Sequence, residues 1–392
     1  MFAPPFDPTD PTDPACPAAR TADSPDTVRT VEVYRHPSAF PADVLQFFER
    51  AERRNAEFGL PWYRNLVDTV YPDHAGIGFY IVRRGRALMA VLPLRAERSG
   101  AGWRLHSLSN FYTTLYEPVL DAAVTPRDLL PLVAALRRDF PGFASLMLAP
   151  MDTAAPAWSM LLAALRQSGL ATFDYFTHGN WALPVTARWR DYLAARDGQL
   201  RSTIKRMDKK FAAAGGRLEI LRDPAAMPAA IAAYEAVYQA SWKRPEPFPR
   251  FMPGLMQTYA AAGALRVGLA WLDGRPIAAQ LWIVANGRAA IYKLAYHDDF
   301  KAYSPGTLLT AMLMERALDT DQVGEVDYLV GDDPYKRAWM SERRERRGIV
   351  AYNPRSLAGL AGLAYECMGR LVRMARTCRP GRPSAAPRPS AH

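Results

Sequence analysis

The feature that most restricts the fold of this chain is a pattern of strands and helices that occurs twice. Residues 78–98 have the pattern of two strands joined by a tight Arg-Gly-Arg turn, and residues 264–286 repeat it around an Asp-Gly turn. A third strand pattern that runs into a loop follows each pair, at residues 103–120 and 288–300. The sequence therefore predicts a tandem duplication of one unit. The alternative is that both halves share only the common patterning of α/β proteins.

The continuation of each half indicates the class of fold. Each loop is followed by a helix pattern, at residues 125–140 and 304–320, and then by a short apolar strand pattern. We therefore expect an α/β (α+β) fold of two similar domains, each a mixed twisted sheet flanked by helices. The chain of 392 residues is also longer than one hydrophobic core usually organises. The predicted segments are a disordered Pro- and Asp-rich N-terminus (1–28), a first domain (29–185), a second domain (186–355), an amphipathic helix (356–378) and a disordered tail (379–392).

Both ends of the chain bear on where the protein works. The N-terminal segment lacks the basic and apolar parts of a secretory signal, and no apolar run approaches the roughly 20 residues that cross a bilayer. The three cysteines, Cys16, Cys367 and Cys378, lie near the ends and are expected to be reduced and unpaired. We therefore expect a cytoplasmic protein.

The formal charge of +10 is compatible with phosphorylated cofactors, nucleic acid or an anionic membrane surface. Its basic residues concentrate at 201–210, 336–347 and 370–382, which are equally compatible with solvated faces. The helix at 356–378 carries Arg370, Arg373 and Arg376 along a stripe separate from its apolar residues. It is expected to dock on the protein's own core, and the alternative is peripheral contact with an anionic membrane at its inner face.

Between the two halves, residues 187–216 form one long helical pattern that Gly215 and Gly216 end. A further helix pattern at 226–244 precedes the Pro-rich loop 245–253, which is a candidate lid or acceptor-site wall.

A candidate binding site for a pyrophosphate group lies at the start of the helix at 304–320. Ser304 stands at its N-cap, Pro305 occupies its first position and Gly306 keeps its entrance uncrowded. Free backbone N–H groups and the helix dipole can receive a pyrophosphate there, with Lys301 adding charge from the edge. A well-capped structural helix can begin in the same way.

The strand at 325–331 leads into the segment Asp-Asp-Pro-Tyr-Lys, which contains candidate catalytic residues. Asp332 or Asp333 could accept a proton, Tyr335 could return one to a leaving thiolate, and Lys336 could hold a phosphate or an acidic acceptor. Because ligands collect beyond the carboxyl ends of strands, we expect these side chains near Ser304. The structural alternative is that both aspartates cap the next helix and the lysine is solvated.

The segments RPIAAQLWI, IYKLAYHDDF, KAYSPGTLLTAMLMERAL and VDYLVGDDPYKRAW, taken together, resemble the acetyltransferase domain of CelD/BcsL-like proteins. These proteins are associated with cellulose and exopolysaccharide biosynthesis and belong to the GNAT superfamily, close to FemAB peptidyltransferases. The resemblance spans about residues 189–352, and the first half resembles the FemAB-type tandem arrangement in pattern only. It implies tandem GNAT-like domains, acetyl-CoA or another acyl-CoA as donor, and direct attack of an amine or hydroxyl on the thioester.

The resemblance also assigns residues. It implies a donor site at Ser304, Gly306 and Thr307, and it marks Asp332, Tyr335 and Lys336 as the distinctive residues of the family. Secondary candidates for contact with the acceptor are Trp242, Lys243 and Gln280. The segment KAYSPG lacks the first glycine of the usual pyrophosphate loop, Gln/Arg-x-x-Gly-x-Gly/Ala, so the donor site departs from the common pattern.

The sequence contains no motif of a metal site, a serine hydrolase or a nucleotide hydrolase. The histidines are scattered without metal-ligand spacing, and neither a Gly-x-Ser-x-Gly segment nor a Walker-type loop is present. We therefore expect no metal.

The leading hypothesis is an acyl-CoA-dependent N- or O-acyltransferase for a small metabolite, amino sugar or cell-envelope precursor, with its site in the cleft between the halves. One alternative is FemAB-like transfer from aminoacyl-tRNA, with residues 201–210 against the RNA backbone. The other is a non-catalytic module that binds nucleic acid or a membrane surface, although no nucleic-acid-binding motif is present.

Overall fold

The computed structural model describes residues 28–377 apart from residues 75 and 101. The segments expected to be disordered lie outside the described residues, except for residue 28. Cys16 and Cys378 are outside them too, whereas Cys367 is described as a free, exposed thiol.

The first half contains a twisted run of strands with helices packed on both faces. Its elements are β1 (Arg29–Tyr34), η1 (Pro37–Ala39), α1 (Ala42–Glu52), η2 (Ala56–Phe58), α2 (Leu60–Val70), β2 (Ile77–Arg84), β3 (Ala87–Ser99), β4 (Gly102–Ser107), β5 (Val119–Leu120), α3 (Pro126–Asp139), β6 (Ser145–Asp152), α4 (Pro156–Gln167) and β7 (Ala171–Pro184). Helix α3 begins with a capping box between Thr125 and Asp128. The buried Asp128 also pairs with Arg29 and Arg84, which ties α3 to β1 and β2.

The second half begins with two helices and ends with the helix that closes the described chain. Its elements are α5 (Trp189–Ala194), α6 (Gly198–Ala213), β8 (Arg217–Leu221), η3 (Pro224–Ala226), α7 (Met227–Gln239), α8 (Phe251–Ala261), β9 (Leu265–Leu272), β10 (Arg275–Ala285), β11 (Arg288–Tyr296), η4 (Asp298–Tyr303), α9 (Pro305–Glu315), the π-helical turn η5 (Arg316–Thr320), β12 (Glu325–Asp327), α10 (Pro334–Trp339), β13 (Glu342–Tyr352) and α11 (Leu357–Thr377).

The duplicated pattern is present in three dimensions. If β5, the linking helices α5 and α6 and the short η turns are left out, the first half has the order β1-α1-α2-β2-β3-β4-α3-β6-α4-β7. The second half repeats it as β8-α7-α8-β9-β10-β11-α9-β12-α10-β13. In each half an antiparallel meander leads to one parallel pair, β4 with β6 and β11 with β12, joined through a helix. The prediction of an α/β fold of two similar halves, with mixed sheet flanked by helices, is confirmed, although the two halves form one continuous sheet instead of two.

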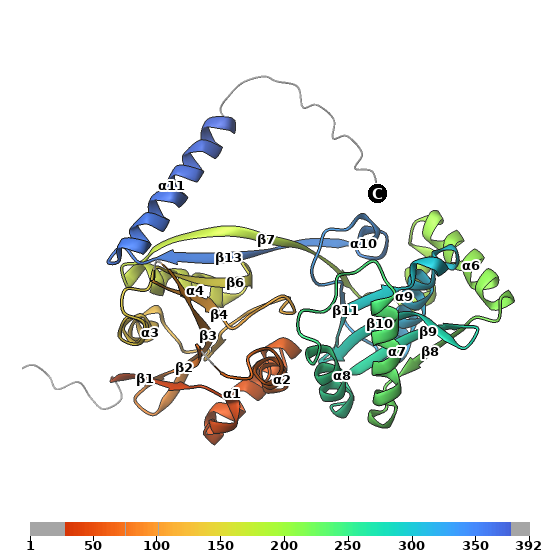
Figure 1. Ribbon diagram of the computed structural model, residues 1–392, viewed down its shortest axis with the longest axis horizontal. Coiled ribbons are helices and arrows are strands. Elements are labelled where there is room, and N and C mark those ends of the chain that lie inside the picture. Colours follow the sequence, from red (N-terminus) through yellow and green to blue (C-terminus); the bar gives the residue numbers. More distant parts are fainter. Residues whose placement is uncertain (1–27, 75, 101, 378–392) are drawn as a thin grey trace, which may run out of the picture.

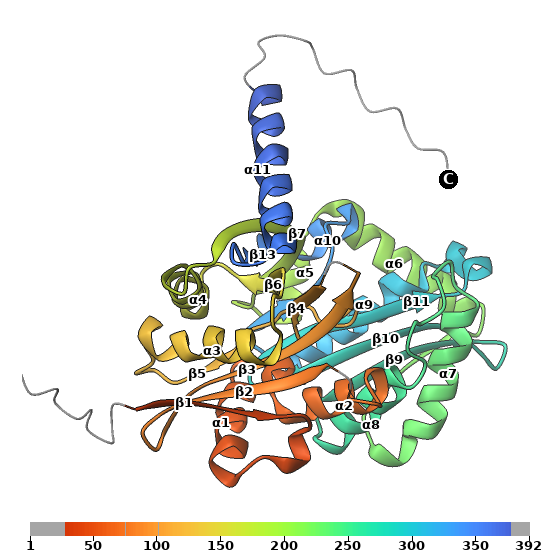
Figure 2. The same cartoon turned by 60° about the vertical axis from the view of Figure 1, so that its left-hand side comes forward.

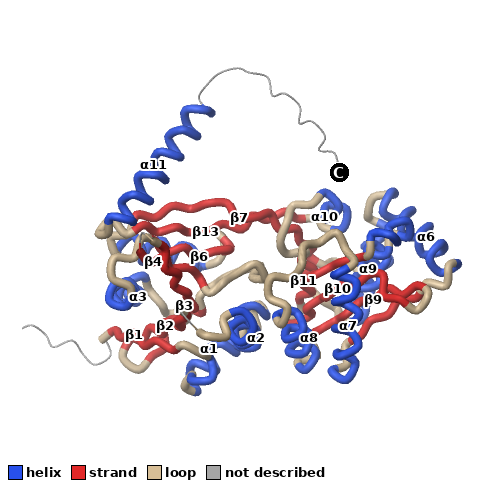
Figure 3. Tube along the Cα trace, viewed as in Figure 1, coloured by secondary structure: helices blue, strands red, loops and turns tan. Residues whose placement is uncertain are grey.

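The two halves share one sheet because they exchange their last strands. The strand order is β1-β2-β3-β4-β6-β13-β7-β12-β11-β10-β9-β8, with β5 beside β3. Strand β13 therefore lies next to β6 of the first half, and β7 lies next to β12 of the second (Figure 1). The strands in Figure 3 accordingly continue from one half into the other. A boundary at residue 185 falls directly after β7, but no break in the sheet accompanies it.

A hydrophobic core also crosses from one half to the other. Helices α1 and α2 pack with α7 and α8, and the Trp62 ring meets the rings of Phe251 and Tyr292 edge-on. Asn65 Nδ2 donates to the backbone oxygen of Phe251 at 3.1 Å. The halves are therefore joined both through the sheet and beneath it.

The helices that connect the two halves, and the helix that follows the second half, differ in part from those predicted. The single helix predicted over 187–216 is two, because Asp197 accepts a hydrogen bond from Gln199 N and caps a new helix. Its predicted end is confirmed, with Gly215 at φ +79° just beyond α6. The helix expected over 226–244 stops at Gln239 as α7.

The expected C-terminal helix is α11, but it projects from the body in Figures 1 and 2 instead of lying on the core. No helix among the described residues is long and apolar enough to cross a membrane.

The exchange of strands predicts that close packing between β7 and β13 is needed for stability. An added Cβ at Gly348 of β13 would lie only 2.4 Å from the Tyr175 ring of β7. Gly348→Val should lower the free energy of unfolding by about 2 kcal/mol, measured by urea denaturation. Gly100→Val is the matched control, because the space beside Gly100 is open. Equal stability of the two variants would contradict this account.

Candidate active site

The candidate site is a cavity that opens where β11 and β12 separate. The two strands pair only from Arg288 to Ala290 on β11 and from Glu325 to Asp327 on β12. Strand β11 then continues to Tyr296, while the segment after β12 turns away at Leu329, which has φ +54°. The resulting cavity of about 240 Å³ is lined by residues 291–294 on one side and 328–330 on the other.

The corresponding position in the first half is closed. There β4 and β6 pair from Arg104 to His106 and from Ser145 to Met147. Just beyond, the hydroxyls of Ser107 and Ser109 both donate to the backbone oxygen of Ala149 at 2.8 Å. Ala149 N donates back to Ser107 Oγ at 3.1 Å. Because these bonds bridge the two strands, the first half lacks the opening found in the second.

A buried ion pair fixes the point at which β11 and β12 separate. Asp327 is fully buried and pairs with Arg288, and it also accepts hydrogen bonds from Asn180 Nδ2 and from Leu329 N at 2.6 Å. Burial alone would raise the pKa of Asp327, but Arg288 and these donors outweigh it and hold the pKa below its ordinary value. The bond to Leu329 N holds the turn that leads the chain away from β11.

Three lysines give the cavity its charge. Lys293 Nζ lies 3.2 Å from Glu246, and Lys336 Nζ lies 3.2 Å from Asp333 and donates to the Val330 carbonyl. Burial lowers the pKa of both lysines. Burial, with the nearby charge of Lys293, lowers the pKa of Lys243 to about 8. Within the described chain no carboxylate lies at ion-pair distance from Lys243.

The first half supplies the opposite wall of the cavity. Phe111, Tyr112 and Thr114 come from the loop after β4 and line the cavity together with the lysines. Tyr112 OH donates to Glu246 at 2.7 Å, and Tyr292 OH donates to the backbone oxygen of Tyr112 at 2.7 Å. The ammonium of Lys293 lies over the rings of Phe111 and Tyr112, 4.8 and 5.0 Å from their centres. The cavity is thus in the predicted place, between the halves.

The buried Glu57 anchors this loop. Its carboxyl group accepts hydrogen bonds from the backbone N–H groups of Thr114 and Leu115 and from the Thr114 hydroxyl. Burial raises the pKa of Glu57 to about 7 in spite of these donors. The carboxyl group thereby fixes the loop to η2 of the first half.

The structure places two of the three predicted catalytic residues at the cavity and the third outside it. Tyr335 and Lys336 line the cavity, and so does Asp333. Asp332 lies outside, where it pairs with Arg343 at 2.7 Å and accepts from the indole N–H of Trp181 at 2.7 Å. The hydrogen bonds from Arg343 and Trp181 lower the pKa of Asp332, which makes it a weak proton acceptor. The structure thus argues against Asp332 as the base, and Asp333 is the carboxylate that faces the cavity.

The predicted donor residues surround the start of α9. Ser304 occupies the N-cap with φ +48°, and its backbone oxygen accepts from Thr307 N and Leu308 N. Gly306 N has no acceptor among the described residues. Lys301 is exposed on the preceding turn η4.

The three residues predicted to contact the acceptor also lie at different places in the structure. The Trp242 ring packs at a tilt against Tyr296, with the ring centres 4.6 Å apart, and the Tyr296 ring borders Gly306. Trp242 therefore lies between the cavity and the start of α9. Lys243 lines the cavity. Gln280 does not, contrary to its predicted role, because its buried amide donates to the Gly306 carbonyl and the Thr310 hydroxyl at 2.8 Å each. Gln280 therefore fixes α9 to the sheet.

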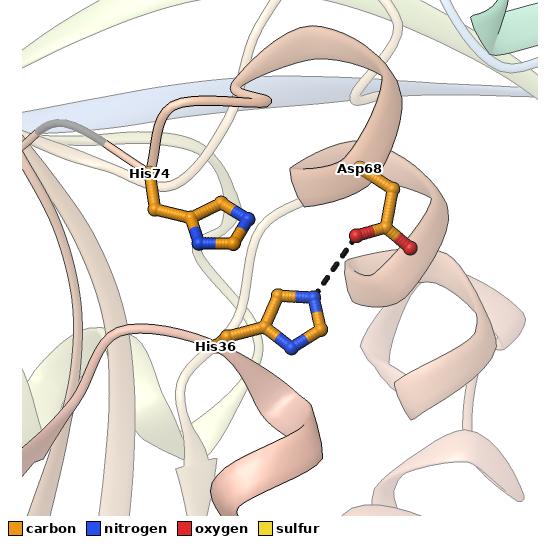
Figure 4. A group of neighbouring side chains, drawn as sticks. All are labelled: His36, Asp68 and His74. Carbon is orange, nitrogen blue, oxygen red and sulfur yellow. Dashed lines mark hydrogen bonds and ion pairs between the residues drawn. The ribbon is translucent and has the colours of Figure 1, made fainter.

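A second group of polar side chains lies away from the cavity. His36 Nε2 is 2.9 Å from Asp68 Oδ1, and the rings of His36 and His74 stack 4.8 Å apart (Figure 4). Potential metal-ligating atoms of these three residues lie within 4.8 Å of one another. Sequence spacing did not indicate this group, because β1, α2 and the next loop bring it together. Its hydrogen bonds join the end of β1 to α2, and the expected absence of a metal stays a prediction.

Comparisons with known proteins agree with this geometry. Residues 198–337, from α6 to α10, match the family model described as an acetyltransferase (GNAT) domain. The second half carries a GNAT-type domain. The match includes the cavity lysines and the start of α9, whereas membership of the CelD/BcsL group stays a prediction. No curated protein matches the chain.

Solved structures share the fold across both halves. One is the C-terminal domain of a putative lysylphosphatidylglycerol synthetase from Agrobacterium fabrum, with 15% identity, a TM-score of 0.51, and coverage of 84% of this chain and 96% of that one. FemX has 11% identity, a TM-score of 0.51 and coverage of 70% and 87%. A conserved protein of unknown function from Bacteroides thetaiotaomicron has 11% identity, a TM-score of 0.52 and coverage of 83% and 100%. At these identities the likeness concerns the fold alone.

The buried Asp327 predicts a charge-dependent contribution to stability. Asp327→Asn keeps the shape but removes the partner of Arg288, and should lower the free energy of unfolding at pH 7 by about 3 kcal/mol. Because the folded-state pKa of Asp327 is depressed, this contribution is complete above the ordinary value of 3.8 and is lost as the pH falls through the folded-state pKa. Urea denaturation of both proteins between neutral and acid pH measures the difference.

Asp332→Asn is the control, because it alters an exposed pair of the same type and should change stability far less. A difference between wild type and Asp327→Asn that stays constant down to strongly acid pH would contradict the assignment.

Proposed function

We propose that this protein is an acyltransferase that takes its acyl group from acyl-CoA at the start of α9. The acceptor is an amine or hydroxyl group, on a small metabolite, an amino sugar or a cell-envelope precursor, held in the cavity between the halves. The observation that carries the proposal is the separation of β11 from β12 beside that helix start, within the GNAT-type domain. A thioester bound along the separated strands would present its carbonyl carbon to the acceptor.

The donor site in this proposal uses the positive end of α9. The unbonded N–H of Gly306 and the helix dipole suit the pyrophosphate of CoA. Helix α6 packs against α9, and its Lys210 lies over the Tyr303 ring and donates to the Ala302 carbonyl at 3.0 Å. Other basic residues of α6, including Arg206 and Lys209, can meet further phosphate charge at the same entrance.

The cavity residues fit direct transfer without a covalent intermediate. Lys243, with a pKa of about 8, is partly neutral near physiological pH and can accept a proton from the attacking amine or hydroxyl. The new bond to the acyl carbon forms as the carbon–sulfur bond breaks. Tyr335 lines the cavity, and partial burial raises its pKa, so its phenol stays protonated and can donate a hydrogen bond to the leaving thiolate. Lys336, braced by Asp333, can hold an anionic part of the acceptor.

A second candidate is transfer of an amino acid from aminoacyl-tRNA. The observation that favours it is the row of exposed basic residues on α6 beside the start of α9, which suits an RNA backbone as well as CoA. Tight tRNA binding that weakens steeply with salt, without saturable binding of acyl-CoA, would favour this donor.

The donor proposal predicts the effect of a charge at the helix start. A side chain at Gly306 would meet Tyr296 at an ordinary contact distance of 3.5 Å, so Gly306→Asp should fold. Its carboxylate should repel the pyrophosphate and weaken acetyl-CoA binding at least tenfold, measured by titration calorimetry. Gly306→Asn has the same size without the charge and should bind much more tightly than the Asp variant. Absence of saturable acyl-CoA binding by the wild type at low salt would refute the donor assignment.

The cavity proposal predicts a pH profile. The rate at saturating acyl-CoA should rise with pH and level off above about 8, as Lys243 loses its proton. Lys243→Met should abolish this rise and lower the rate at least a hundredfold, with acyl-CoA affinity retained. Tyr335→Phe should lower the rate without removing the rise. An unchanged profile in Lys243→Met would exclude it as the base, and full activity in both variants would place the catalytic groups elsewhere. Absence of acyl transfer by the wild type would favour a non-catalytic module.

A further inference from the structure

Helix α11 is attached to the body by its small and polar residues. A Cβ at Gly359 would lie 2.1 Å from the Asn353 carbonyl oxygen and 2.9 Å from that of Ala144, and one at Gly362 would lie 2.7 Å from the Tyr352 ring. About two turns further on, Arg370 donates to the Asp174 carbonyl at 2.7 Å and lies over the Phe173 ring. Glycines and an arginine thus make the contacts that a helix packed on a core makes through apolar side chains.

The opposite side of α11 is apolar and exposed to solvent. At 100° per residue, its large apolar side chains cover about half of the circumference, mostly on the side away from Gly359, Gly362 and Arg370. These side chains, with their exposed fractions, are Leu357 (87%), Leu360 (45%), Tyr365 (77%), Met368 (60%), Leu371 (61%), Val372 (48%) and Met374 (56%). Tyr365, at one edge of this face, also lines a cavity against β4, β6 and β13. Such a face is normally buried, but no described part of the chain covers it.

The charge of the helix indicates what covers this face. Glu366 is the one acidic residue in the sequence of α11, against Arg370, Arg373 and Arg376, and it is already paired with Arg370 at 2.8 Å. The sequence after residue 377 adds Arg379, Arg382 and Arg388 without any acidic residue. A wide apolar face with arginines beside it is typical of helices that lie in the interface of an anionic bilayer, whereas a coiled coil has a narrower apolar seam.

We propose that α11 is a membrane-docking helix, which inserts its apolar face into the surface of a bilayer that contains anionic lipids. Figures 1 and 2 both show α11 extending away from the sheet. The proposal does not rest on the proposed function, because no residue of α11 lines the cavity between the halves.

The test is sedimentation of the full chain with vesicles of phosphatidylcholine alone or mixed with phosphatidylglycerol. Wild type should pellet with the mixed vesicles, release as salt is raised, and bind phosphatidylcholine at least tenfold more weakly. The double variant Met368→Glu/Leu371→Glu should lose at least tenfold in binding to the mixed vesicles. It should melt at the wild-type temperature, because both side chains are exposed.

Arg222→Glu is the matched control, because it changes the net charge by the same two units at an exposed site after β8. It should bind the mixed vesicles as wild type does. Failure of wild type to bind mixed vesicles, or equal binding by the double variant, would overturn the proposal. So would a wild-type dimer in sedimentation velocity that the double variant abolishes, because a second copy would then cover this face.

Discussion

The pairing of β7 with β13 is the contact on which the rest of the architecture depends. It runs from Ala182 opposite Glu342 to Ala171 opposite Tyr352, in the middle of the sheet, between two strands that come from different halves of the chain. Each strand completes the sheet of the half to which it does not belong. Because both halves are held to this pair, the β4 loop of the first half reaches the cavity of the second. The same pairing places the end of β13, and hence the start of α11, at the far side of the first half.

Burial of charge distinguishes the second half from the first. In the first half, uncharged serine hydroxyls close the gap after the parallel pair. In the second, the Asp327–Arg288 pair links the two strands just before they separate, and three lysines line the opening. Two of these lysines have carboxylate partners and Lys243 has aromatic rings instead, with its ammonium 5.7 Å from the centre of Trp242. An ammonium ion in such surroundings is poorly solvated, so a proton leaves it more easily and an anion stabilises it more strongly.

Local signals in the sequence were enough to predict the repeat, because strand alternation, tight turns and helix caps each depend on a few neighbouring residues. The start of α9 at Ser304 and Pro305 and the strand pairs of both meanders were predicted in this way. The exchange of β7 and β13 was not, because strand partners far apart in sequence leave no local trace. For the same reason Phe111 and Tyr112, which come from the other half, were missed. Lys293 had one signal, a charged residue within an otherwise apolar strand. Asp332 and Asp333 are adjacent, and only the fold shows which one faces the cavity.

The strand exchange also separates the unit of sequence similarity from the unit of folding. Residues 198–337 match a domain family, yet this segment contains neither β7 nor β13. If it were excised, β12 would become an exposed edge with unpaired backbone groups, and the helices beneath the sheet would lose the apolar partners that α1 and α2 provide. A fragment chosen by similarity would therefore be prone to aggregate. A circular permutant that keeps both exchanged strands would retain the complete sheet.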